Sequence, residues 1–161
     1  MDGLAVLRAQ LLAQLRGGQA HMGFEDVVAN FPLELINTRP PHVPYTPWHL
    51  VEHIRISQWD ILEFVRNPDH VSPEWPTGYW PDPASRATPA QWKQTLSAFR
   101  QDMRDVEALA SDLSIDLFSI IPHGTGQTIL REILLVADHN AYHIGELGIL
   151  RQVMQAWTDA R

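Results

Sequence analysis

The sequence predicts an all-α protein, a four-helix bundle with a long aromatic-rich loop after its second helix. Two observations predict this class. Apolar residues recur at helical spacing in four long segments, each bounded by a capping residue, a proline or a glycine. No stretch alternates apolar and polar residues over a useful length, apart from a short candidate strand at 118–121. At 161 residues, the chain is expected to form a single domain spanning 1–161.

The first half of the chain contains one long helical pattern and one short one. Leucines recur at helical spacing from Leu4 to Leu15, and Gly17-Gly18 ends the pattern. A short helix is predicted from Phe24 to Asn30. The proline-rich stretch 38–44 then excludes regular structure.

The second helix is predicted to begin at Thr46-Pro47, because threonine caps a helix and proline fits its first position. It ends before Pro68. Residues 68–87 are rich in proline, tryptophan and tyrosine, and this stretch is longer than an ordinary connection between helices.

Two further helices complete the pattern. Thr88-Pro89 opens the third helix, which continues to about Leu113. Thr125 or Thr128 caps the last helix, which reaches about Trp157.

Composition excludes several classes of function. The formal charge of −7 and the absence of any lysine or arginine run argue against binding to nucleic acid or to an anionic membrane. The chain has no cysteine, so it has no disulfide, no thiolate nucleophile and no sulfur ligand for a metal. It shows no signal-peptide pattern and no apolar run long enough for a bilayer. We therefore expect a cytoplasmic protein.

Two pairs of histidines, each four residues apart, are the most informative feature. His139 and His143 lie within the last helix, and His49 and His53 lie within the second. Residues four apart on a helix lie on the same face, so each pair could grip one ion. Neither pair has a glutamate directly after its first histidine, so neither fits the His-Glu-x-x-His motif of helical zinc proteases.

Helix geometry indicates which histidines face the core. At about 100° per residue, His139 and His143 fall within the apolar sector of the last helix. On the second helix His53 lies on the core side, and His49 lies further round. We therefore choose His53 as a third ligand and keep His49 as a substitute or an outer contact. A single histidine of this kind is more often a core residue bonded to a carbonyl. Two adjacent buried imidazoles, however, need two partners or one cation.

At these residues the chain resembles members of the DinB superfamily, the DinB/YfiT-like metalloenzymes. The match comprises a histidine on the second helix, within Leu50-Val51-Glu52-His53-Ile54, and the run His139-x-x-x-His143-x-Gly145. The resemblance implies a bundle in up-up-down-down order, often dimeric, that binds a divalent metal through His53, His139 and His143. Characterised relatives transfer low-molecular-weight thiols such as bacillithiol or mycothiol. This chain has Ile144-Gly145-Glu146 where Arg-Gly-Gln is commoner after the last histidine.

The resulting hypothesis is a metal-dependent enzyme with one divalent ion (zinc, nickel, iron or manganese) and three nitrogen ligands. It would transfer a low-molecular-weight thiol to an electrophilic small molecule, and it would act as a homodimer. A metal-dependent hydrolase is the nearest alternative. The alternative from another functional class is a non-catalytic stress protein that binds a metal or a small molecule. A dimer with a vestigial site is a further alternative.

Several neighbouring residues each have two interpretations. Glu146 could accept the second N–H of a ligand histidine, although a solvated glutamate is commoner. Asp60 and Glu132 would need a partner if they were buried, and Glu132 could pair with Arg55 or Arg131. His123 fits a surface turn better than the mouth of the bundle. The aromatic loop could be a lid or a subunit contact, or could fold over the bundle itself; its aromatic residues are Trp75, Tyr79 and Trp80.

Overall fold

The computed structural model describes residues 2–157, and these residues confirm the all-α class. The predicted strand at 118–121 is wrong: it contributes only an isolated bridge between Ile120 and Thr128. In chain order, the elements are α1 (Gly3–Arg16), α2 (Phe24–Val28), α3 (Pro47–Arg66), the 3-10 turn η1 (Thr77–Tyr79), α4 (Pro89–Ser111) and α5 (Ile129–Val153).

Three threonines start the long helices as their sequence context predicts. The side-chain oxygens of Thr46, Thr88 and Thr128 accept hydrogen bonds from backbone N–H groups in the first turns of α3, α4 and α5. Of the two candidate caps for the last helix, Thr128 is therefore the one used. α5 ends at Val153, before the predicted Trp157, and Met154 is its C-cap.

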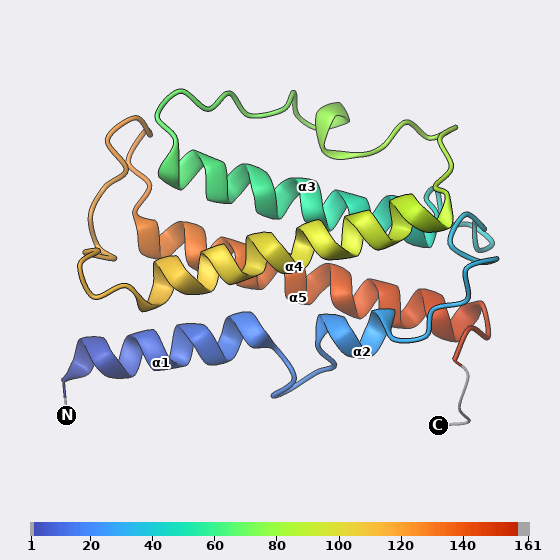
Figure 1. Ribbon diagram of the computed structural model, residues 1–161, viewed down its shortest axis with the longest axis horizontal. Coiled ribbons are helices and arrows are strands. Elements are labelled where there is room, and N and C mark those ends of the chain that lie inside the picture. The colour runs from blue at the N-terminus through green and yellow to red at the C-terminus, as the bar shows by residue number, and fades with distance from the viewer. Residues whose placement is uncertain (1, 158–161) are drawn as a thin grey trace.

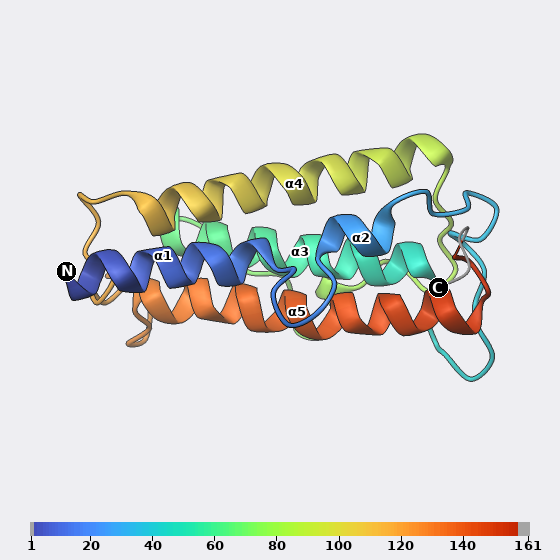
Figure 2. The same cartoon turned by 90° about the horizontal axis from the view of Figure 1, so that it is seen from below.

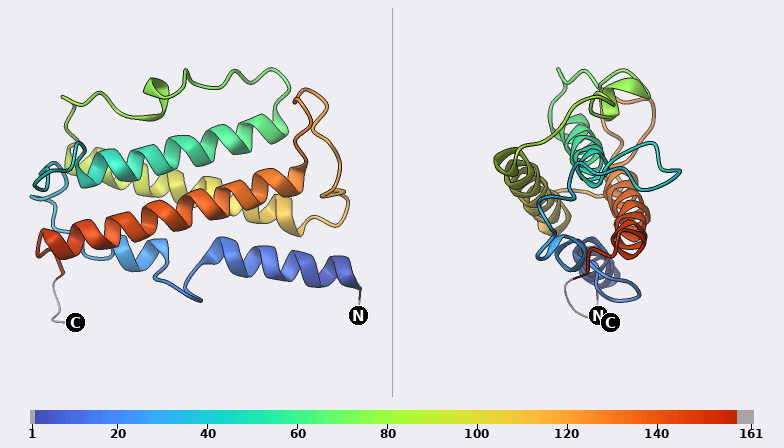
Figure 3. Two further views of the ribbon diagram at one scale, coloured as in Figure 1. Left: turned by 180° about the vertical axis from the view of Figure 1, so that it is seen from behind. Right: turned by 90° about the vertical axis from the view of Figure 1, so that its right-hand side faces the viewer.

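The four long helices lie side by side along the long axis of the molecule (Figures 1 and 2). Seen end-on, in the right-hand view of Figure 3, α1, α3, α4 and α5 surround a common centre. α1 and α5 run in one direction, and α3 and α4 run in the other. The expected up-up-down-down order is therefore wrong, and the observed order is up-down-down-up.

The connection 67–88 explains this order. Instead of turning tightly into the next helix, it returns along the outer side of α3 (Figure 1), so that α4 starts at the same end as α3. Two partly buried side chains of the connection hold it there, through the buried Asp60 of α3. Tyr79 donates its hydroxyl proton to Asp60 Oδ2 at 2.6 Å, and His70 Nε2 lies 2.7 Å from Asp60 Oδ1. Asp60 thus has two loop partners and lies outside the histidine cluster described below.

The core consists of two apolar clusters along the bundle axis. One joins α2, α3, α4 and the second half of α5, and is centred on Leu50, Ile54, Phe99 and Leu147. The other joins α1 to the remaining ends of α3, α4 and α5, and includes Leu11, Leu62, Val106 and Ile133. Between residues 2 and 157, none of the helices is long and apolar enough to cross a bilayer. The histidines of α3 and α5 lie beside the first cluster.

Candidate metal centre

Three histidines from two helices converge on one point. Nε2 of His53, on α3, lies 3.2 Å from Nε2 of His139 and 3.2 Å from Nε2 of His143, both on α5. One ring nitrogen from each residue can be chosen so that all three lie within 4.8 Å of one another. His53 is buried and the other two are half-buried. The structure therefore brings together the three residues that the sequence singled out.

The outer hydrogen bonds of two of these histidines determine where their protons lie. Nδ1 of His53 lies 2.9 Å from the Tyr79 carbonyl oxygen, which can only accept. Nδ1 of His143 lies 2.6 Å from Oε2 of Glu146, which accepts when it is ionised. Each Nδ1 therefore carries the proton, and each neutral ring points the Nε2 lone pair inward. Two lone pairs that face each other at 3.2 Å repel unless a cation lies between them.

Burial favours the neutral form of two of these rings, His53 and His139. Burial and the neighbouring His143 and His53 lower the pKa of His139 to about 4. Burial also lowers the pKa of His53. Nδ1 of His139 is buried, and the neighbouring Asn140 side chain offsets part of the lowering of the His139 pKa. Three imidazoles whose Nε2 atoms converge on one point are the donor set that zinc, nickel, iron or manganese accepts. The residues present therefore fit a divalent metal ion.

Glu146 connects the cluster to a second layer of side chains. One carboxylate oxygen accepts from His143, and the other accepts a short hydrogen bond from the Tyr45 hydroxyl. Burial and this carboxylate raise the pKa of Tyr45 above its ordinary value. Of the two interpretations of Glu146, the structure thus shows the contact with a histidine N–H. Such carboxylate–histidine pairs fix the ring orientation and make the inner nitrogen more basic.

The aromatic loop forms one wall of the site. The Trp80 ring stacks on the His53 ring, with centroids 3.9 Å apart and planes 3° from parallel. The other stacking partner of Trp80 is Tyr45, with a centroid distance of 5.2 Å. Sequence reasoning did not assign Tyr45 to the site, because it lies just before α3, outside the helical pattern that selected the histidines. Its only sequence signal was its place directly before the capping Thr46.

The remaining candidates have other partners. Both ring nitrogens of His49 are engaged: Nδ1 accepts from the Thr46 backbone N–H at 3.3 Å, and Nε2 lies 3.1 Å from the Ser85 carbonyl. His49 thus helps to cap α3 and to hold the loop, and it is not a substitute ligand. Glu132 pairs with Arg131 at 2.7 Å. His123, on an exposed turn, bonds to the Phe64 carbonyl.

Replacing Glu146 with glutamine should weaken metal binding by about 10–100-fold, because a neutral amide orients and polarises His143 less well than a carboxylate does. Isothermal titration of metal-free protein with zinc measures this change. The matched control is Glu107→Gln, which alters an exposed ion pair between α4 and Arg16 at the end of α1. Equal zinc affinities in the two variants would contradict the role given to Glu146.

The metal-free protein should lose stability on acidification because of His139. The pKa of this residue falls from an ordinary value of 6.5 to about 4 in the folded chain. The unfolded chain therefore binds the proton more readily, and the contribution of His139 is present above pH 6.5 and lost towards pH 4. Urea unfolding should be measured in the presence of a metal chelator. The difference in free energy of unfolding between wild type and His139→Leu should shift against the wild type as the pH falls from 6.5 towards 4. A constant difference between the two proteins would contradict this expectation.

The comparisons with known proteins agree with this geometry. The model of the DinB superfamily matches residues 16–147, which include α3, α4, the cluster and most of α5. None of the curated proteins and none of the solved structures matches the chain. The family match covers most of the chain and contains all three histidines, so the chain belongs to the DinB superfamily.

Proposed function

We propose that the protein is a divalent-metal-dependent transferase that adds a low-molecular-weight thiol to an electrophilic small molecule. The observation that carries this proposal is the convergence of three Nε2 lone pairs, two of them fixed by outer hydrogen bonds. Three protein ligands leave coordination positions open, as in catalytic rather than structural sites. The thiol must come from a cosubstrate, because the chain has no cysteine.

The residues have distinct roles in this proposal. His53, His139 and His143 hold the ion, and the Tyr79 carbonyl and Glu146 keep two of the rings in the binding tautomer. A divalent cation at this position would lower the pKa of a bound thiol, so that a thiolate is available at neutral pH. The thiolate sulfur forms a bond to an electrophilic carbon, and the leaving group departs with its electron pair.

Aromatic side chains around the histidines favour an apolar electrophile. The Trp80 face that stacks on His53 shields one side of the cluster. Tyr142 is 70% exposed, and its ring centroid lies 4.8 Å from that of His143. An aromatic or alkyl halide could pack against these rings while its reactive carbon approaches the ion. Family membership supports thiol transfer over hydrolysis, because characterised relatives use low-molecular-weight thiols.

A turnover screen tests the proposal. Metal-loaded protein is incubated with glutathione, bacillithiol or mycothiol and with 1-chloro-2,4-dinitrobenzene, and both thioether and chloride are measured. We expect the metal-loaded wild type to form thioether and chloride in equal amounts. His139→Ala should form neither product. Chloride release without thiol would indicate the hydrolase alternative, and no turnover by the loaded protein with any pair would favour a binding protein.

We also propose that the arrangement is a DinB/YfiT-type bundle that forms a homodimer through α5. Leu134, Tyr142, Ile149 and Val153 are exposed and recur at helical spacing, so they form one apolar stripe along the outer face of this helix. Analytical ultracentrifugation should show a dimer for wild type and a monomer for Ile149→Glu. A monomeric wild type at high concentration would exclude this interface.

A further inference from the structure

One residue of the connection 67–88 contacts both α3 and the histidine cluster. The hydroxyl of Tyr79 donates to Oδ2 of Asp60 at 2.6 Å, and the backbone carbonyl of Tyr79 accepts from Nδ1 of His53 at 2.9 Å. Asp60 and His53 are both buried on α3. Tyr79 therefore joins a carboxylate outside the cluster to the histidine that contacts both other members of the cluster.

The periodicity of α3 allows this double contact. His53 and Asp60 are seven residues apart, which is close to two helical turns, so both side chains leave the same face about 10 Å apart along the axis. His49 lies one turn before His53, and its Nε2 is 3.1 Å from the Ser85 carbonyl of the same connection. Three side chains of α3 thus hold the connection at three levels of the helix.

The segment around Tyr79 is a compact turn. The backbone N–H of Gly78 donates to the Glu74 carbonyl at 2.7 Å, and a Cβ added at Gly78 would lie 2.8 Å from Cβ of Pro73. The backbone N–H of Tyr79 donates to the Pro76 carbonyl at 3.2 Å. Because these contacts tie the turn to itself, it moves as one unit. Losing the anchor of the Tyr79 side chain on α3 would therefore also displace the Tyr79 carbonyl.

The Tyr79 hydroxyl is a stable donor to Asp60. Burial and the Asp60 carboxylate raise the pKa of Tyr79 to about 12, so the hydroxyl keeps its proton at neutral pH. Ser72, in the same connection, also hydrogen-bonds to this hydroxyl. The other oxygen of Asp60 lies 2.7 Å from Nε2 of His70. Asp60 is thus the shared anchor on α3 for two side chains of the connection.

The Tyr79 carbonyl selects between two arrangements of the neutral His53 ring. With the proton on Nδ1, held by this carbonyl, Nε2 directs a lone pair into the cluster. With the proton on Nε2, the same ring would donate to Nε2 of His139 or of His143, each 3.2 Å away. The second arrangement closes the cluster on itself and occupies the atom that a metal ion needs. Loss of the carbonyl contact therefore favours the closed arrangement.

Trp80, the next residue, acts on the same ring in a different way. Its ring stacks on the His53 ring with centroids 3.9 Å apart. Stacking restricts the plane of the imidazole, but it does not select a tautomer, because both ring nitrogens lie in that plane. The position of the proton therefore depends on the contact with the Tyr79 carbonyl.

We propose that Asp60 is a positioning residue for the histidine cluster. Through the hydroxyl of Tyr79 it holds the Tyr79 carbonyl on His53, and it thereby keeps the proton of His53 on Nδ1 and leaves Nε2 for a metal ion. The role of His53 as a metal ligand belongs to the proposed function, on which this inference rests. The tautomer of His53 is also a property of the metal-free protein, so the two can be tested separately.

The tautomer of His53 provides a readout that a general loss of stability does not change. The ¹⁵N-labelled protein is studied in a metal chelator at about pH 8, where the ring is neutral because burial lowers its pKa below the ordinary 6.5. Long-range proton–nitrogen correlation spectra distinguish an Nδ1–H ring from an Nε2–H ring, and His53→Gln identifies the signals of this residue. We expect the Nδ1–H form in wild type and a large share of the Nε2–H form in Tyr79→Phe and in Asp60→Ala.

Zinc affinity, measured by isothermal titration, provides the second arm. Tyr79→Phe removes only the hydroxyl and should weaken zinc binding about 3–10-fold, the effect of one net hydrogen bond. Asp60→Ala should weaken it at least as much, because both side chains of the connection lose their acceptor. The double variant should bind zinc within about twofold of Asp60→Ala alone, because the hydroxyl then has no carboxylate to hold it.

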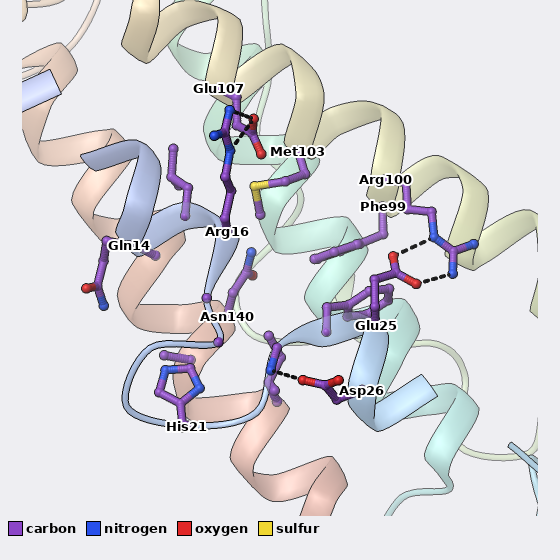
Figure 4. A pocket seen from close by; sticks show the side chains of 18 of the residues that line it. Gln14, Arg16, His21, Glu25, Asp26, Phe99, Arg100, Met103, Glu107 and Asn140 are labelled. Carbon is purple, nitrogen blue, oxygen red and sulfur yellow. Dashed lines mark hydrogen bonds and ion pairs between the residues drawn. The ribbon is translucent and has the colours of Figure 1, made fainter. Parts of the chain in front are cut away.

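Two control variants change contacts elsewhere. Asn37→Ala removes the two hydrogen bonds, each 2.8 Å, that hold Ala87 at the end of the same connection. Arg100→Met removes an ion pair with Glu25 at the cavity between α1, α2, α4 and α5 (Figure 4), on the opposite side of the bundle from the connection (Figure 1). Both should keep the wild-type tautomer and zinc affinity. Circular dichroism melting verifies that every variant is folded.

Failure of the positioning role and failure of the proposed function give different results. The positioning role would be overturned by a wild-type His53 with its proton on Nε2, or by a tautomer that is unchanged in Tyr79→Phe and Asp60→Ala. The same shift in Asn37→Ala, or additive losses of zinc affinity in the double variant, would also overturn it. A wild type with the expected tautomer shifts in its variants, but without affinity for zinc, nickel, iron or manganese, would support the positioning role and overturn the metal-dependent function.

Discussion

Replacing His139 with alanine should abolish stoichiometric metal binding. Structural zinc sites with four ligands have binding free energies of about 10–16 kcal/mol, or about 2.5–4 kcal/mol for each ligand. Loss of one of three ligands should therefore weaken binding by roughly 10²–10³-fold, since 1.4 kcal/mol corresponds to a factor of ten. Elemental analysis of protein purified without an affinity tag should give about one ion per wild-type chain and almost none per variant chain.

Thermal unfolding provides an independent readout of the same change. Metal at about 1,000 times its dissociation constant should stabilise the wild type by about 4 kcal/mol, and it should not stabilise His139→Ala. The control is His123→Ala, because His123 lies on an exposed turn and bonds to the Phe64 carbonyl. Equal metal content and equal stabilisation of the two variants would remove His139 from the site.

Replacing Arg151 with methionine should lower the free energy of unfolding by about 3–5 kcal/mol. Arg151, near the end of α5, is only 1% exposed. Its guanidinium donates to the carbonyls of Val27 at 3.1 Å, Ala29 at 2.9 Å and Ala156 at 2.9 Å. Methionine has a similar length but no donor, so two buried carbonyls and one partly buried carbonyl would lose a partner, each buried one at a cost of about 1–3 kcal/mol.

Urea unfolding measures this loss, and Arg104→Met is the matched control. Arg104 is exposed on α4, where one guanidinium nitrogen bonds to the Gln101 side chain. Its replacement should change the free energy of unfolding by less than about 0.5 kcal/mol. Similar values for the two variants would show that the contacts of Arg151 do not hold the α2 segment on α5.

The helices could be predicted because their signals are local. Threonine caps and first-turn prolines mark the starts of α3 and α4, and the apolar period identifies the face that each helix buries. The choice of His53, His139 and His143 followed from the same periodicity, because rings on the apolar face must meet the facing helix. The path of the 67–88 connection was not predictable, since it depends on the contacts of Asp60 with Tyr79 and His70.

The outer contacts of the site were beyond sequence reasoning for a related reason. Trp80 stacks on His53 only because the long connection returns along α3, and a loop sequence does not specify that path. Glu146 was ambiguous because a glutamate three residues after a histidine can face either solvent or the ring. Arg151 gave no signal, because one arginine in a helix is normally exposed. The hydrogen bond that Asn140 donates to Gln58 gave no signal either, because the two residues are 82 positions apart in the chain.

The most direct test of the central claim is anomalous diffraction from crystals of metal-loaded protein, measured at the absorption edge of the bound element. We predict one strong peak per chain at about 2.0–2.1 Å from Nε2 of each of the three histidines, the usual zinc–nitrogen distance. A peak elsewhere would contradict this claim. The absence of any peak, with the three Nε2 atoms hydrogen-bonded only to one another, would also contradict it.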